Sequence, residues 1–189
     1  YLEDVATLFV KNMNEWVIPD IIEVLIFGLS NQSYKGDDAR STRKEYSLKL
    51  LSLITDMYPH FIKKNLVNLI SPVSMLSIDL NRGVNEAANE LLLKIVNCNG
   101  NSDLTPFLPS VIKFLSGNMQ TEEIIDELAG CIFVQDVELP ALSIIEPILF
   151  EGLKNRKNEI QRKACVIIDN MCKLIEKPEE ILPIASRMK

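Results

Sequence analysis

Apolar residues recur every three to four positions along most of the chain, which is the spacing of one face of an α-helix. No segment alternates between apolar and polar residues as a half-buried strand would. The pattern predicts outer and inner helices in alternation, after a short helix over 1–13. The expected outer helices cover 16–29, 60–78, 104–116, 139–153 and 179–189. The expected inner helices cover 39–57, 83–97, 120–134 and 158–176. We therefore expect an all-α fold.

Four prolines enter similar apolar runs along the chain. Pro72, Pro109, Pro147 and Pro183 follow one another at intervals of 37, 38 and 36 residues. This period is close to the roughly 40 residues of HEAT and armadillo units. Because the apolar pattern continues beyond the first three prolines, we expect each to kink an outer helix rather than end it.

The inner helices repeat as well. Val84 and Ile160, which lie 76 residues apart, each open a helix, and each is followed four residues later by an alanine, Ala88 or Ala164. A small residue there lets neighbouring inner helices approach closely. The segment 39–57 is similar, with Arg43 where a HEAT unit commonly carries an arginine.

These periods predict a single HEAT-repeat α-solenoid over 1–189, with about four to five antiparallel helix pairs. The approximate units are 1–57, 58–98, 99–136, 137–177 and a partial unit 178–189. The polar stretch Asn31 to Ala39 is expected to be an exposed loop. Because the chain begins at Tyr1 without a methionine and the pattern stops within a unit, we expect a fragment of a longer array.

Composition excludes several classes of protein. Hydrophobic residues make up 47% of the chain, too many for a disordered protein. The apolar runs are far shorter than the roughly 20 residues that span a bilayer, and no secretory signal opens the chain. The four cysteines Cys98, Cys131, Cys165 and Cys172 are widely spaced on apolar helical patterns, so we expect buried free thiols in a cytoplasmic protein.

No arrangement of residues predicts catalysis. None of the seven glycines precedes a lysine, which excludes a P-loop for nucleotide phosphates. His60 is the only histidine, and no serine or cysteine motif is placed for it to activate. The acids of 122–127 have the spacing of a solvated helix face rather than of a cation-binding loop. We therefore expect no enzyme activity, cofactor, metal or small-molecule substrate for this segment.

Charge is unevenly distributed, although the net charge is −6. Residues 119–138 hold six acids and no basic residue, whereas 154–163 hold five basic residues and one acid. The five are Lys154, Arg156, Lys157, Arg162 and Lys163. A smaller basic set comprises Lys35, Arg40, Arg43, Lys44 and Lys49. In a solenoid both sets would lie on one ridge, where they would contact phosphate. The alternative is an ordinary solvated rim.

The last unit has a more specific sequence. The string Gln161 to Leu174 (QRKACVIIDNMCKL), together with Leu139 to Pro147 before it, closely resembles the N-terminal HEAT domain of the translation elongation factor 3 family. The resemblance keeps its register from about 42 to 178, and the nine residues Val166 to Leu174 are its most specific part. A related HEAT region occurs in the large ribosome-associated activator of the amino-acid-starvation kinase, but Asp169 to Cys172 favour the elongation factor.

The resemblance implies a non-catalytic scaffold that docks an ATP-binding-cassette factor onto the ribosome, contacting ribosomal proteins and rRNA. In the family, that factor promotes release of deacylated tRNA from the exit site. The catalytic cassettes lie outside this segment, so no ATPase residue is carried over. Arg156, Lys157, Arg162 and Lys163, with Lys154 and the set Arg40, Arg43 and Lys44, are the candidate ribosome contacts. The alternative is a free-standing adaptor for a protein partner.

Most of the nine residues Val166 to Leu174, which we call the signature, have a structural explanation. Six of them are expected on the buried face of the inner helix: Val166, Ile167, Ile168, Met171, Cys172 and Leu174. Asp169 and Asn170 are weak helix formers that usually need a local partner. We expect them to make a hydrogen bond between units, with a partner contact as the alternative.

Overall fold

The structure is a computed structural model that describes residues 2–30 and 37–185. Those residues form helices and connecting segments without a strand, as the apolar spacing predicts. The chain divides into two compact units, Tyr1–Cys98 and Asn99–Lys189, each of which is described by itself. The prediction of one continuous array over both units stays a prediction.

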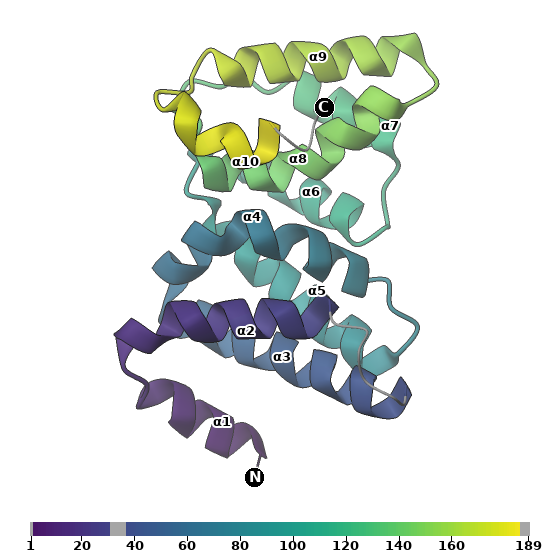
Figure 1. The fold of residues 1–189 in the computed structure, drawn as a ribbon. Helices are drawn as coiled ribbons and strands as arrows, with labels where there is room; N and C mark the ends of the chain where they lie inside the picture. Colours follow the sequence, from purple (N-terminus) through teal and green to yellow (C-terminus); the bar gives the residue numbers. More distant parts are fainter. Residues whose placement is uncertain (1, 31–36, 186–189) are drawn as a thin grey trace. The chain divides into compact units, whose positions relative to one another are not determined.

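The first unit contains two layers of helices (Figure 1). In chain order its elements are α1 (Leu2–Lys11), the 3-10 helix η1 (Glu15–Val17), α2 (Ile18–Ser30), α3 (Asp37–Met57), α4 (Pro59–Leu76) and α5 (Arg82–Val96). Outer helix α2 packs on α4, and inner helix α3 packs on α5. Because each helix also packs on its partner in the same pair, the apolar stripes of both layers meet in one core.

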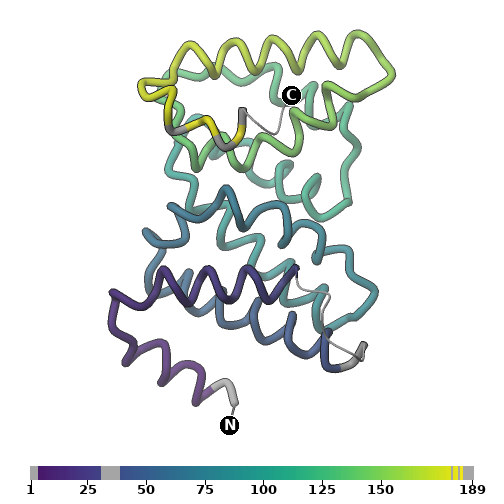
Figure 2. Tube along the Cα trace, viewed as in Figure 1, coloured from purple at the N-terminus to yellow at the C-terminus, as the bar shows by residue number. Residues whose placement is uncertain are grey.

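The second unit repeats this arrangement with shorter helices, and the trace in Figure 2 follows the chain through it. The two units meet in the chain at η2 (Asn97–Asn99). The second unit then contains η3 (Ser102–Phe107), α6 (Leu108–Leu115), α7 (Thr121–Ala129), α8 (Leu139–Lys154), α9 (Asn158–Cys172), η4 (Pro178–Ile181) and α10 (Leu182–Ala185). Here α6 packs on α8 and α7 packs on α9. The predicted small residues Ala88 and Ala164 are both buried in their inner helices.

The prolines act in two different ways. Pro72 and Pro147 lie inside α4 and α8, which continue across them as expected. The prediction for Pro109 is wrong, because it lies in the first turn of α6, where its missing N–H has no helical partner to lose. The expected helix 104–116 is therefore two elements, η3 with Pro106 inside it and α6.

Two expected inner helices end early. Helix α7 stops at Ala129 with Gly130 as its C-cap, and beyond it the backbone N–H groups of Val134 and Gln135 donate to Asp103 Oδ2 at 2.7 and 2.8 Å. Helix α9 stops at Cys172, and the Val137 N–H donates to the Leu174 carbonyl at 2.9 Å. These side-chain and loop contacts offer the backbone an alternative to helical hydrogen bonds.

The ends of two further predictions also change. Of the expected loop Asn31 to Ala39, residues 31–36 lie outside the described residues, and Asp37–Ala39 begin α3. The expected outer helix 179–189 is η4 followed by α10, and residues 186–189 lie outside the described part.

The cysteines are free thiols, but only Cys131 is buried. Cys98 is half-buried, and Cys165 and Cys172 are exposed on α9. The predicted burial is wrong for these last two because the buried stripe of α9 runs through Ile160, Ala164, Ile167 and Met171 at helical spacing, and leaves their face open.

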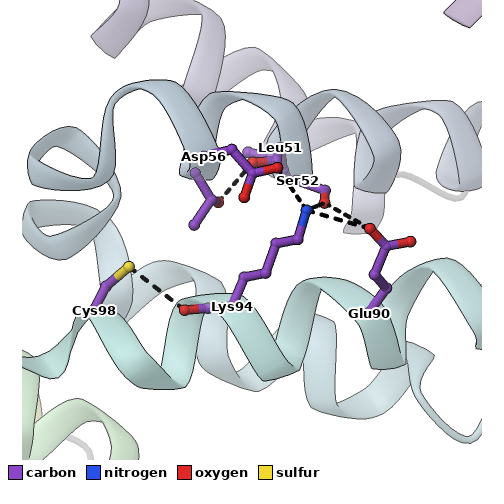
Figure 3. A network of polar contacts seen from close by, with 7 residues as sticks. Leu51, Ser52, Asp56, Glu90, Lys94 and Cys98 are labelled. Carbon is purple, nitrogen blue, oxygen red and sulfur yellow. Dashed lines mark hydrogen bonds and ion pairs between the residues drawn. The ribbon is translucent and has the colours of Figure 1, made fainter.

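A polar network joins the two inner helices of the first unit (Figure 3). Lys94 Nζ on α5 lies 2.7 Å from Asp56 Oδ2 and 2.7 Å from Ser52 Oγ, both on α3. The Ser52 hydroxyl donates to Glu90 Oε1 at 3.2 Å, which closes the network. Burial of the lysine lowers its pKa, but hydrogen bonds to Asp56 and Glu90 outweigh this effect, so the pKa of Lys94 is raised overall.

Candidate functional site

The larger basic set lies where α8 ends and α9 begins. Lys154 is the last residue of α8, and Arg156 and Lys157 lie in the connection to α9. Arg162 and Lys163 occupy the first turns of α9. All are exposed except Lys163, which is half-buried. Their closeness in sequence and the tight connection place them at one end of the α8–α9 pair.

Asn155 fixes the connection that carries these residues. Its Oδ1 accepts the Lys157 backbone N–H at 3.0 Å, and its carbonyl accepts Gln161 Nε2 at 2.8 Å. Its Nδ2 donates to Glu122 Oε1 on α7 at 3.2 Å. The turn is therefore held both to the helix that follows it and to the preceding inner helix.

Acids on α7 and α9 compensate two of the five basic residues. Lys157 Nζ lies 3.5 Å from Glu122 Oε1, and Lys163 Nζ lies 2.9 Å from Asp126 Oδ1 and 2.6 Å from Glu159 Oε1. The pKa of Glu122 is lowered by the hydrogen bond from its own backbone N–H and by the Asn155 amide. Hydrogen bonds to Glu159 and Asp126 raise the pKa of Lys163. Both shifts favour the charged forms of Glu122 and Lys163, and the ion pairs compensate the positive charge of the two lysines.

The remaining three cations face solvent. Lys154 Nζ lies 3.5 Å from the centroid of the Phe150 ring, a cation–π contact that leaves its positive charge uncompensated by an acid. Arg156 and Arg162 are exposed, and neither forms an ion pair within residues 2–30 and 37–185. The two guanidinium groups are thus the strongest open positive charges of this surface, which we call the arginine surface (Lys154, Arg156 and Arg162).

The smaller basic set has a different environment. Lys35 lies outside the described residues, and Arg40, Arg43 and Lys44 are half-buried on α3. Lys44 Nζ pairs with Asp79 Oδ2 at 3.3 Å, with both side chains mostly covered. The two basic sets belong to different compact units, so the prediction that they share one ridge stays a prediction.

The signature residues of α9 are arranged otherwise than expected. Asp169 Oδ2 pairs with Lys173 Nζ at 2.6 Å, one turn along the same helix, and both side chains are about two-thirds exposed. The expected hydrogen bond between units is therefore wrong for Asp169, since its partner lies four residues away. Asn170 is exposed. Val166 is 51% exposed and Cys172 is exposed, whereas Ile167 and Met171 are buried, so the signature covers two faces of the helix.

The described part of the chain contains no group of three or more His, Cys, Asp or Glu side chains arranged to hold a metal ion. Among the same residues, no helix combines the length and apolar character needed to cross a membrane. The arrangement offers instead surfaces for contact. The sequence alone does not indicate one of them, a groove between α2 and α4, because its walls come from two helices separated in the chain by α3.

Comparison with known proteins identifies the kind of HEAT array. Residues 119–189 match the family model described as "Elongation factor 3/GNC1 HEAT repeat". Elongation factor 3 of Phytophthora infestans is 31% identical over 178 residues, which cover 94% of this chain and 17% of the relative. Elongation factor 3B of Saccharomyces cerevisiae is 34% identical over 141 residues, or 75% of this chain and 14% of the relative.

The chain is a homologue of the HEAT region of elongation factor 3. A third relative, elongation factor 3 of Candida albicans, is 32% identical over 168 residues, covering 89% of this chain and 15% of its own length. The chain thus spans less than a fifth of the length of these relatives. The resemblance seen in the signature of α9 is confirmed, and it extends over both compact units.

Proposed function

We propose that this chain is a non-catalytic docking scaffold that helps an elongation-factor-3-like protein bind the ribosome in the cytoplasm during elongation, when exit-site tRNA is released. The arginine surface supports this proposal most directly. Arg156 and Arg162 are exposed, lie at the end of one helix pair and have no acidic partner in the described chain. A guanidinium fork binds phosphate oxygens well, so rRNA is the expected contact.

The other basic residues contribute less to the proposed contact with the ribosome. Lys157 and Lys163 already pair with acids of α7, so binding phosphate would require them to weaken those pairs. Arg40, Arg43 and Lys44 are half-buried, which limits their reach toward a partner. We therefore assign most of the electrostatic contact to Arg156 and Arg162, with Lys154 beside them.

The test is salt-dependent co-sedimentation of the chain with purified Saccharomyces cerevisiae ribosomes. In the Arg156→Glu/Arg162→Glu variant, we expect weaker binding and a less negative slope of the logarithm of the binding constant against the logarithm of salt concentration. Removing one phosphate contact changes that slope by about 1, so the expected change for two arginines is about 2.

The matched control is Lys64→Glu/Lys113→Glu, which makes the same charge change at two exposed lysines outside the arginine surface. We expect the control to bind like the unmodified chain, apart from a small general effect of net charge. Equal binding by the arginine variant and the unmodified chain would refute the assignment of the surface. Equally weakened binding in both variants would show a general charge effect instead of a contact.

A further inference from the structure

A groove runs between outer helices α2 and α4, which lie side by side in Figure 1. Its volume is about 590 Å³, and residues of both helices line it. Those that matter here are Asp20, Glu23 and Ile26 on α2, and Asn68, Pro72 and Met75 on α4. The groove uses none of the residues of the arginine surface and lies in the other compact unit.

Negative charge is concentrated at one end of the groove. Asp20 and Glu23 are exposed, lie almost one helical turn apart, and neither forms an ion pair within the described part of the chain. The residues that line the groove include no lysine or arginine. Two uncompensated carboxylates on the rim of a groove attract a cationic ligand.

The proline in α4 adds a backbone acceptor to the opposite wall of the groove. Pro72 has no N–H, so it cannot donate to the carbonyl of Asn68, four residues earlier in the helix. Both residues line the groove. The Asn68 carbonyl and side-chain amide on α4, together with the two carboxylates on α2, make the groove rich in acceptors for a ligand that brings N–H donors.

The other end of the groove is apolar. Met75 is 70% exposed, and Ile26 and Pro72 are half-buried beside it. An exposed methionine next to partly covered apolar side chains forms an adaptable surface for an apolar side chain of a partner. The groove therefore combines a negative end, hydrogen-bond acceptors and an apolar end.

We propose that the groove between α2 and α4 docks a segment of a basic protein. One or two lysine or arginine side chains of the segment contact Asp20 and Glu23, and an apolar side chain packs on Ile26, Pro72 and Met75. Charge complementarity selects this occupant, because a nucleic acid would bring its phosphates against the two carboxylates. This contact goes beyond the proposed phosphate contact and is independent of it.

The experiment is a selection of random twelve-residue peptides displayed on phage against the immobilised chain. We expect the enriched peptides to contain at least one lysine or arginine and a nearby apolar residue. Synthesised with a fluorescent label, they should bind the unmodified chain and bind the Asp20→Lys/Glu23→Lys variant at least about tenfold more weakly, by fluorescence anisotropy.

Two further variants separate the groove from general effects. Glu127→Lys/Glu151→Lys makes the same charge change at exposed acids of the second unit and should leave peptide binding unchanged. Met75→Lys should weaken binding while the carboxylates remain. Circular dichroism checks that each variant keeps its helical content.

Three results would overturn the proposal. Enriched peptides without basic residues would mean that charge does not select the ligand. Equal decreases in affinity for the groove variant and the second-unit control would mean that net charge alone is responsible. Binding of a labelled single-stranded RNA with an affinity that depends on Met75 would assign the groove to nucleic acid.

Discussion

Lys94 and Asp56 join adjacent inner helices by an ion pair of 2.7 Å between residues 38 positions apart. Lys94 also lies 3.3 Å from Glu90, one turn earlier on its own helix. The same geometry occurs in the second unit, where Lys163 pairs with Asp126, 37 residues before it, and with Glu159, four residues before it. The period of the repeat is therefore visible in its charge pairs as well as in its prolines.

Replacing Lys94 by methionine should destabilise the first unit. The substitution keeps the apolar stem but leaves Asp56 and Glu90 near each other without a cation. Because the lysine side chain is mostly covered, we expect the unfolding free energy to fall by about 1 to 2 kcal/mol. Urea unfolding, monitored by circular dichroism, measures this change in unfolding free energy.

A double-mutant cycle with Asp56→Asn isolates the pair itself. The coupling energy should be about 0.5 to 1 kcal/mol, since both groups remain partly exposed. Lys64→Met, at an exposed lysine of α4, is the control and should change stability little. A coupling energy of zero would mean that the network contributes nothing across the two helices.

Gly152 on α8 lies close to the inner helices α7 and α9 of the second unit. A Cβ at this position would lie 2.9 Å from Ile125 Cδ1 and 3.1 Å from Ala164 Cβ. We expect Gly152→Val to destabilise the chain by about 2 to 3 kcal/mol, because the added carbons overpack this contact. At Gly130 a Cβ would meet only the Glu127 carbonyl oxygen at 3.4 Å, so Gly130→Ala should be nearly neutral. Thermal unfolding measures the stability of both variants. Equal losses of stability in the two variants would count against tight packing at Gly152.

The four thiols should react with maleimide in a fixed order. Cys165 and Cys172 are exposed and should be modified first. Burial, with the nearby Asp103 carboxylate, raises the pKa of Cys131 from 9.0 to about 11, so its thiolate fraction at pH 8 is about a hundredfold lower. Mass spectrometry of timed samples at pH 8 gives the order. Early modification of Cys131 would show that its surroundings open readily.

Stability should decline in alkali through the same cysteine. A group whose pKa is raised on folding stabilises the fold below its unfolded pKa, and that contribution disappears as pH rises through the folded value. For Cys131 the decline should fall between pH 9.0 and about 11. We expect about 1 to 2 kcal/mol, allowing for screening by solvent.

The measurement compares unfolding free energies of the unmodified chain and of Cys131→Ala at pH 8 and pH 11. Other groups titrate in this range, so only the difference between the two proteins reports on the thiol. The variant should show a smaller decline in stability than the unmodified chain. Identical declines would contradict the assigned role of Cys131.

The sequence was sufficient to predict most helices because their apolar stripes repeat at helical spacing. The prediction at Pro109 was wrong because the same apolar run fits either a kinked helix or the start of a new helix. The predicted burial of Cys172 and Val166 was also wrong, because an apolar residue on an amphipathic helix does not by itself show which face of the helix is buried. In the basic set, Lys157 pairs with Glu122, 35 residues away, and Lys163 pairs with Asp126, 37 residues away, as well as with the nearby Glu159. Only the fold brings Glu122 and Asp126 close to these lysines.

The charge pairs between successive inner helices have a consequence for how such an array can change during evolution. If recombination removed the α2–α3 pair or duplicated the α4–α5 pair, one α5 helix would pack on a helix other than α3, and its Lys94 would lack Asp56. The apolar stripes would still fit, since they are alike from unit to unit, but the buried part of the network would be mismatched. Units of this array are therefore expected to be inherited in a fixed order, each adapted to the neighbour it already has.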